Sequence, residues 1–207
     1  MALDFDQHYY QQGYRLLVGV DEAGRGCLLG PVFAAAVILP TDFNSDLIND
    51  SKKLSAKQRE KAYQIIIDNA IAYGIASVGP DEIDEVNILN ASRLAMKKAI
   101  VAMKHDFDIV LTDCMKIPGY EVPVIDLVHG DALSQSIAAA SILAKVSRDR
   151  LCEELDKEYP VYHIKKNKGY GTKDHLEALK KYGPVKHLHR FSYAPVKACF
   201  IEKVSLF

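Results

Sequence analysis

The sequence has no apolar stretch long enough to cross a membrane, and it lacks the basic start and apolar centre of a secretory signal peptide. It also has no internal repeat and no low-complexity linker, and its net charge is only −1. Composition therefore identifies no charged partner, no membrane partner and no obligate protein partner. A cytoplasmic, monomeric α/β protein is expected, with a single core, since about 200 residues bury roughly 70% of the unfolded chain's surface.

Cysteine is scarce and widely spaced in this sequence. The four cysteines form no C-x-x-C pair and no cysteine–histidine knuckle, which argues against a structural zinc site. Isolated cysteines of this kind favour free thiols in a reducing compartment. They are Cys27, Cys114, Cys152 and Cys199.

Apolar runs and helical spacing predict an alternation of strands and helices. Strands are expected over residues 16–21, 31–39, 72–78, 108–112 and 122–127. Helices are expected over 52–70, 86–103 and 131–159, the first with Ser55 as N-cap ahead of Gln58. The first two strands, separated by a glycine turn, are predicted to pair antiparallel. Three successive strands followed by alternating strands and helices favour a mixed sheet with helices packed on it.

Four acidic residues stand where predicted strands end or helices begin. Asp21 and Glu22 follow the first strand, Asp113 follows the strand over 108–112, and Asp131 opens the last helix. Each alone has a structural explanation as an N-cap, a turn residue or a polar strand end.

These acids converge if the strands that end at Asp21 and Asp113 are parallel neighbours. Clustered like charges are unfavourable unless a cation binds among them. Carboxylate oxygens suit Mg²⁺ or Mn²⁺, which in such sites hold substrate phosphates. The pattern predicts metal-assisted phosphoryl chemistry and leaves the substrate open.

Residues 160–190 are strongly basic, with eight lysines or arginines against two acids, and four histidines and three tyrosines among them. A basic segment with interleaved aromatic residues suits a phosphate backbone with a stacked sugar or base. A solvated helix face has the same composition, and the sequence leaves both interpretations open.

Five stretches of this chain, in order, resemble ribonuclease HII, the type 2 ribonuclease H of bacteria. They are GVDEAGRGCLLGPV, DSKKLS, GDALSQSIAAASILAKVSRDR, NKGYGTKDH and HRFSYAPV. The resemblance implies a ribonuclease H-like fold, an α/β architecture with a central mixed five-stranded sheet flanked by helices. Residues 1–159 would form the catalytic core and residues 160–207 a C-terminal helical substrate-binding part of the same continuous unit.

The resemblance also implies an activity. The enzyme would hydrolyse the RNA strand of RNA/DNA hybrids and incise on the 5′ side of single ribonucleotides in duplex DNA, leaving 3′-hydroxyl and 5′-phosphate ends. Two divalent ions, Mg²⁺ or Mn²⁺, would be held by the matching catalytic and metal-binding acids, which are Asp21, Glu22, Asp113 and Asp131.

The chain departs from the family pattern beside two of these acids. Cys114-Met115 replaces the usual Gly-Asn after Asp113, and His129 stands where lysine or glycine is more usual. Because glycine alone visits positive φ freely, Cys114 is expected to restrict the conformation of its turn.

Further matches imply how the substrate would be read. Gly24-Arg25-Gly26 matches the family's junction-sensing turn, and Tyr170 matches the tyrosine that stacks on the deoxyribose after the ribonucleotide. The alternatives are a plain hairpin turn and a core tyrosine. The proposed phosphate contacts are Lys52, Lys53, Lys145, Lys168 and Arg190.

The last residues, Val204 to Phe207, resemble the short hydrophobic tail by which bacterial replication proteins dock on the sliding clamp, without its leading glutamine. A frayed terminus with two packed residues is the alternative. Two alternative functions are considered. One is the sister ribonuclease HIII, which is expected to have an extra N-terminal domain and an S-G-K-G turn. The other is a catalytically inactive nucleic-acid-binding module.

Overall fold

The computed structural model describes residues 5–48 and 54–204 of the chain. Lys52 and Lys53, two of the predicted phosphate contacts, lie outside the described residues. The last three residues of the predicted docking tail, Ser205 to Phe207, lie outside them as well.

Five strands form one mixed sheet in the order β3-β2-β1-β4-β5. The strands are β1 (Leu17–Ala23), β2 (Val32–Ile38), β3 (Ala72–Val78), β4 (Ile109–Asp113) and β5 (Val124–Leu127). β2 runs antiparallel to both β1 and β3, whereas β4 runs parallel to both β1 and β5. The predicted α/β fold with a mixed five-stranded sheet is confirmed.

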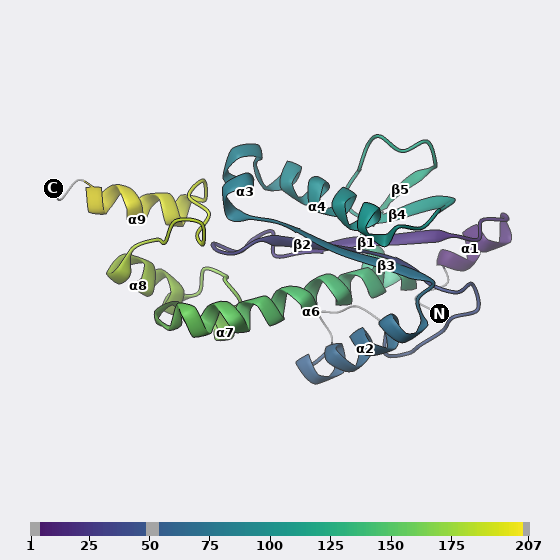
Figure 1. The fold of residues 1–207 in the computed structure, drawn as a ribbon, viewed down its shortest axis with the longest axis horizontal. Coiled ribbons are helices and arrows are strands. Elements are labelled where there is room, and N and C mark those ends of the chain that lie inside the picture. Colours follow the sequence, from purple (N-terminus) through teal and green to yellow (C-terminus); the bar gives the residue numbers. More distant parts are fainter. Residues whose placement is uncertain (1–4, 49–53, 205–207) are drawn as a thin grey trace.

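Helices cover both faces of this sheet (Figure 1). On one face lie α3 (Pro80–Val86) and α4 (Ile88–Met103); on the other lie α6 (Gln135–Glu158) and α2 (Ala56–Asn69). Successive strand side chains point to opposite faces, so β2 contributes Ala34 and Ala36 to the α4 side and Ala35 and Val37 to the α6 side. The apolar run of β2 is therefore buried on both faces.

The long helix α6 packs directly on β1 because Gly19 has no side chain. A Cβ at Gly19 would stand 2.1 Å from the backbone carbon of Ser136. Buried alanines along the first half of α6 continue this close approach. As a result, α6 runs close along β1, and Ser141 of α6 reaches Asp21 near the carboxyl end of that strand.

The remaining helices are short. They are α1 (Phe5–Gln11), α5 (Gly130–Leu133), η1 (Pro160–Tyr162), α7 (Ile164–Asn167), α8 (Lys173–Tyr182) and α9 (Ala194–Val204). The segment from η1 to α9 gathers at one end of the molecule, opposite α1 (Figure 1). No described helix is long and apolar enough to span a bilayer.

The helix predictions were correct in place but not in every boundary. Ser55 caps α2 as predicted, and Gln58 completes the capping box with it. The helix expected over 131–159 is broken at Ser134, whose extended backbone and hydroxyl, 3.1 Å from the amide of Ile137, start α6 anew. Helices α1 and α3 were not predicted.

Candidate active site

Two parallel strands bring the first acids together at one edge of the sheet. Val20 of β1 lies opposite Thr112 of β4, so Asp21 and Asp113 follow at the same level on adjacent strands. The condition under which Asp21 and Asp113 would converge, parallel pairing of these two strands, is therefore met. Asp21 is buried, with only 5% of its surface exposed.

The carboxylates at this edge repel one another. Burial raises the pKa of Asp21 well above its ordinary value, and the charges of Glu22 and Asp113 raise it further, whereas a hydrogen bond from Ser141 lowers it. Burial also raises the pKa of Glu22, partly offset by Arg25. The Oε2 atom of Glu22 is buried and has no hydrogen-bond partner among the described residues.

The fourth acid lies on the short helix after β5. The N–H of Gly130 donates to Oδ1 of Asp113 at 2.7 Å, which fixes the start of α5 against the end of β4. Asp131 follows within the first turn of α5 and is buried. It is not the N-cap residue, because His129 occupies that position.

Both departures from the family pattern adopt a left-handed backbone. Cys114 has φ of 49° and His129 has φ of 59°, a region that glycine occupies at least cost. Cys114 was expected to restrict the conformation of its turn, and the structure holds that turn in a backbone conformation that is unfavourable for cysteine.

A cavity of about 290 Å³ lies against these acids. Three of the predicted metal ligands, the predicted junction turn and Tyr170 all line this cavity. Asp131 does not line it. Its walls come from β1, the turn after it, β4, α2, α6 and the segment before α8. The lining residues are Asp21, Glu22, Ala23, Gly24, Arg25, Gly26, Arg59, Asp113, Ser141, Lys145, Arg148 and Tyr170.

The junction turn requires its first glycine. Gly24 has φ of 98°, and a Cβ there would stand 2.1 Å from Nε of Arg148. The missing side chain of Gly26 leaves room beneath Tyr170, whose ring would lie 3.7 Å from a Cβ at that position. The side chain of Arg25 turns back to Glu22, with 3.3 Å between Nη1 and Oε1.

Arg190 supports the junction turn from inside the protein. Its Nη1 donates to the carbonyl of Arg25 and its Nε to the carbonyl of Gly30, both at 2.9 Å. The hydroxyl of Tyr193 also donates to the carbonyl of Arg25, at 2.5 Å. Because Arg190 is fully buried, the prediction that it contacts a phosphate is wrong.

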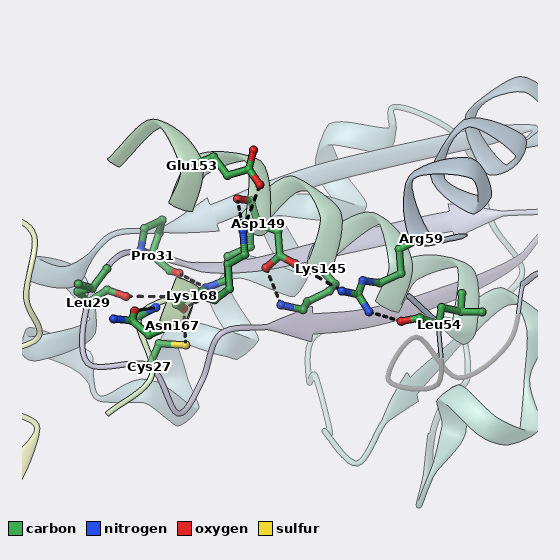
Figure 2. Close-up of polar contacts among 12 residues, drawn as sticks. Cys27, Leu29, Pro31, Leu54, Arg59, Lys145, Asp149, Glu153, Asn167 and Lys168 are labelled. Carbon is green, nitrogen blue, oxygen red and sulfur yellow. Dashed lines mark hydrogen bonds and ion pairs between the residues drawn. The ribbon is translucent and has the colours of Figure 1, made fainter. Parts of the chain in front are cut away.

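The two described lysines of the prediction lie on either side of Asp149 (Figure 2). Lys145 lines the cavity and pairs with the carboxylate of Asp149, which Arg59 also approaches from α2. Lys168 does not line the cavity; its Nζ lies 3.3 Å from Glu153 and 3.4 Å from the backbone oxygen of Asp149.

Three polar residues of the cavity wall were not among the predicted site residues: Arg59, Ser141 and Arg148. Ser141, Lys145 and Arg148 are spaced four and three apart, which places them on one face of α6 and could have identified them. Arg148 is 2% exposed, and its guanidinium donates to the carbonyl of Lys168 at 2.8 Å and to those of Leu29 and Pro31 at 3.4 Å. It therefore joins α6 to both loops that flank the turn.

Within the described part of the chain, no group of three or more histidine, cysteine, aspartate or glutamate side chains is arranged to hold a metal ion by itself. Mg²⁺ at phosphate-transfer sites typically takes one or two carboxylates and completes its shell with water and substrate oxygens. An open edge of oxygen donors, with an unpartnered Glu22 Oε2 and a raised Asp21 pKa, fits such an ion.

Solved structures place the fold in the ribonuclease H class. The ribonuclease H2 from Pyrococcus horikoshii OT3 has a TM-score of 0.76 and 27% identity, covering 90% of this chain and 97% of that one. The chain in the PCNA:RNase HII complex from Archaeoglobus fulgidus has a TM-score of 0.71 and 25% identity, covering 85% and 93%. Bst-RNase HIII in complex with Mn²⁺ shares the fold at a TM-score of 0.72 and 16% identity, covering 96% and 72%.

Sequence comparison identifies the family within that class. The family model described as Ribonuclease HII matches residues 18–196. The ribonuclease HII of Acetivibrio thermocellus is 51% identical over 91% of this chain and 73% of its own length. The chain belongs to the ribonuclease HII family and is a type 2 ribonuclease H, a hydrolase of RNA/DNA substrates, as the resemblance implied.

Proposed function

We propose that this enzyme cuts the RNA strand of RNA/DNA hybrids and incises duplex DNA on the 5′ side of a single embedded ribonucleotide. The products carry a 3′-hydroxyl and a 5′-phosphate, as in ribonucleotide removal during DNA repair. The observation that carries the proposal is the single cavity that holds the acids of β1 and β4 together with the glycine turn and Tyr170.

Asp21, Glu22, Asp113 and Asp131 are the residues that would hold two divalent ions, Mg²⁺ or Mn²⁺. When bound, such ions supply activation of the attacking water and stabilisation of the leaving oxygen. The raised pKa of Asp21 and the unpartnered oxygen of Glu22 support this assignment, because a cation relieves both. Arg25 holds the other oxygen of Glu22 in place.

The junction is read by the turn and by the exposed tyrosine. The 2′-hydroxyl distinguishes ribose from deoxyribose, so the enzyme must contact it. Gly24-Arg25-Gly26 presents bare backbone to the cavity, and Arg190 and Tyr193 hold that backbone from behind. Tyr170, 47% exposed beside Gly26, would stack on the next sugar, where a second 2′-hydroxyl would clash.

Basic residues around the cavity would contact the phosphate backbone. Lys145 lies on the cavity wall, and Lys168 lies beside it across Asp149. Lys52 and Lys53 precede α2, whose first turn carries Arg59 to the same cavity. We assign residues 1–159 to the catalytic core and residues 160–207 to one wall of the substrate groove.

The enzyme would act as a monomer in the cytoplasm, where bacterial DNA lies. Val204 to Phe207 is proposed as a docking tail for the sliding clamp, supported by the similarity of this chain to the nuclease in the PCNA:RNase HII complex. Deletion of these four residues should abolish clamp pull-down and leave cleavage of short duplexes unchanged; unchanged pull-down would refute the tail.

Cleavage of duplex DNA with one ribonucleotide, in Mg²⁺ or Mn²⁺, tests the proposed function. The wild type should cut 5′ to the ribonucleotide, and Asp21→Asn should be at least about 100-fold slower, since even outer-shell changes at metal sites cost 10–100-fold. Asp126→Asn is the matched control, because it makes the same change at an exposed position of β5. An intact duplex with wild type, or equal cleavage by Asp21→Asn, would refute the proposal.

A further inference from the structure

Two buried histidines face each other behind Tyr170. His175 of α8 and His189 of the loop before α9 are both fully buried, and their Nε2 atoms lie 3.5 Å apart. The Nδ1 atom of His189 lies 3.0 Å from the backbone amide of Val185. The Nδ1 atom of His175 lies 2.9 Å from the carbonyl oxygen of Tyr170. The two rings thus connect one backbone amide to one backbone carbonyl.

The partners at the two ends fix where each proton lies. The amide of Val185 can only donate, so Nδ1 of His189 accepts and the proton of that ring is on Nε2. The carbonyl of Tyr170 can only accept, so His175 carries its proton on Nδ1 and leaves Nε2 as an acceptor. The N–H of His189 therefore points at the acceptor of His175. Every bond in the series has one donor and one acceptor only when both rings are neutral.

This series ends on the backbone of Tyr170. The carbonyl of Tyr170 also accepts from the amide of Thr172 at 2.8 Å, and its own amide donates to the carbonyl of Asn167 at 3.0 Å. The backbone of Tyr170 is thus held on the protein side, while its ring stands half-exposed in the cavity next to Gly26. A shift of this backbone would move the ring against the substrate.

We propose that His175 and His189 form a neutral hydrogen-bonded relay that positions Tyr170 for its contact with the sugar at the ribonucleotide junction. The inference rests on the proposed function, because it assigns a cause to the placement of Tyr170. His175 and His189 are positioning residues and touch no substrate.

The surroundings of the pair keep both rings neutral. The ring of Tyr162 packs on them, with centroids 4.8 Å from His189 and 6.1 Å from His175, and its hydroxyl donates to the carbonyl of Gly183. Burial and the neighbouring His175 lower the pKa of His189 to about 4, and burial lowers that of His175. A further proton on either ring would set two N–H groups against each other.

Variants of His175 test the relay through Tyr170. His175→Leu removes the donor to the carbonyl of Tyr170, whereas His175→Asn retains an amide N–H at the position of Nδ1. On duplex DNA with one ribonucleotide, His175→Leu should lower kcat/KM about tenfold, mainly through KM, because the carbonyl of Tyr170 loses one of its two donors and the backbone can shift. His175→Asn should recover most of this loss. Tyr162→Phe is the matched control, since it removes a buried hydrogen bond of the same cluster outside the relay.

A double-mutant cycle separates positioning from general destabilisation. In a Tyr170→Ala background, His175→Leu should cause no further loss of kcat/KM, because its effect passes through Tyr170. An equal loss with and without Tyr170 would overturn the relay while leaving the proposed function standing. If the wild type fails to cut the single-ribonucleotide duplex, the proposed function itself is wrong.

NMR of the imidazole nitrogens tests the relay without any substrate. At neutral pH, His175 should be protonated on Nδ1 and His189 on Nε2. The opposite tautomer at either ring, or a charged ring, would overturn the relay.

Discussion

The acidic edge of the sheet and the buried histidine pair both remove ionisable groups from water, but they do so in opposite ways. At the edge, Asp21, Glu22 and Asp113 carry like charges, and one Glu22 oxygen is left without a described partner. In the histidine pair, each ring nitrogen has one partner of the right kind. The comparison separates a site that needs an external ligand from a scaffold that is complete without one.

Buried arginines connect these two regions. Arg148 of α6 reaches the loop after β1 and the carbonyl of Lys168, and Arg190 reaches the junction turn from the other side. Arg148 donates to three backbone carbonyls, and Arg190 donates to two backbone carbonyls and to the hydroxyl of Tyr193. The turn that would read the ribonucleotide is therefore held between the catalytic core and the C-terminal segment.

Of the changes proposed here, replacing Arg148 should lower the stability of the protein most, because it breaks the connection between α6 and the two loops beside the junction turn. Arg148→Met removes a hydrogen-bond donor from each of the carbonyls of Leu29, Pro31 and Lys168, which should lower the free energy of unfolding by about 3 kcal/mol. Urea unfolding measures this change. Lys145→Met, one turn earlier on α6 and partly exposed, is the control and should cost less than about 1 kcal/mol. Equal losses for the two variants would contradict the role of Arg148.

Lowering the pH should weaken the histidine pair. The pKa of His189 is about 4 in the folded protein, below its ordinary value of 6.5, so the unfolded chain takes up the proton first. Its contribution is complete above pH 6.5 and is lost as the pH falls towards 4, by up to about 3 kcal/mol. Unfolding free energies measured across this range for wild type and His189→Asn should converge at low pH; parallel curves would contradict the prediction.

Relieving the strained turn beside Asp113 should have the smallest effect, and in the opposite direction. Cys114→Gly should raise the free energy of unfolding by about 0.5–1 kcal/mol, because glycine accepts a left-handed backbone that costs other residues about 1–2 kcal/mol. Cys114→Ala is the control and should give no gain, since the backbone strain remains. Thermal unfolding of the two variants measures the difference. An equal gain in stability with Cys114→Ala would show that backbone strain at position 114 is not the cause.

The sheet could be predicted because its signals are local. Residues 72–78 were predicted as a strand and form β3 with those bounds, and the apolar run of β2 marks a strand buried on both faces. The parallel pairing of β1 and β4 then placed Asp21 beside Asp113. Helix α3 also carries local signals, namely Pro80 at its first position and acids in its first turn.

The missed features depend on contacts distant in sequence. Arg190 stands in a basic segment that suggested a surface, yet its acceptors are the carbonyls of Arg25 and Gly30, more than 150 residues away. The break at Ser134 is hidden among small and apolar residues that also suit a continuous helix. α1 is short and lacks an apolar period, although Asp6 accepts from the amide and hydroxyl of Ser136.

Thermal unfolding of wild type and Asp21→Asn, with and without Mg²⁺, tests most directly whether the acidic edge is built for a cation. The raised pKa of Asp21 means that this residue costs the metal-free fold stability at neutral pH, because the unfolded chain holds the ionised carboxylate more easily. Without metal, Asp21→Asn should therefore have the higher Tm, and Mg²⁺ should raise the Tm of wild type more than that of the variant. A lower Tm for metal-free Asp21→Asn, or equal shifts with Mg²⁺, would contradict the account.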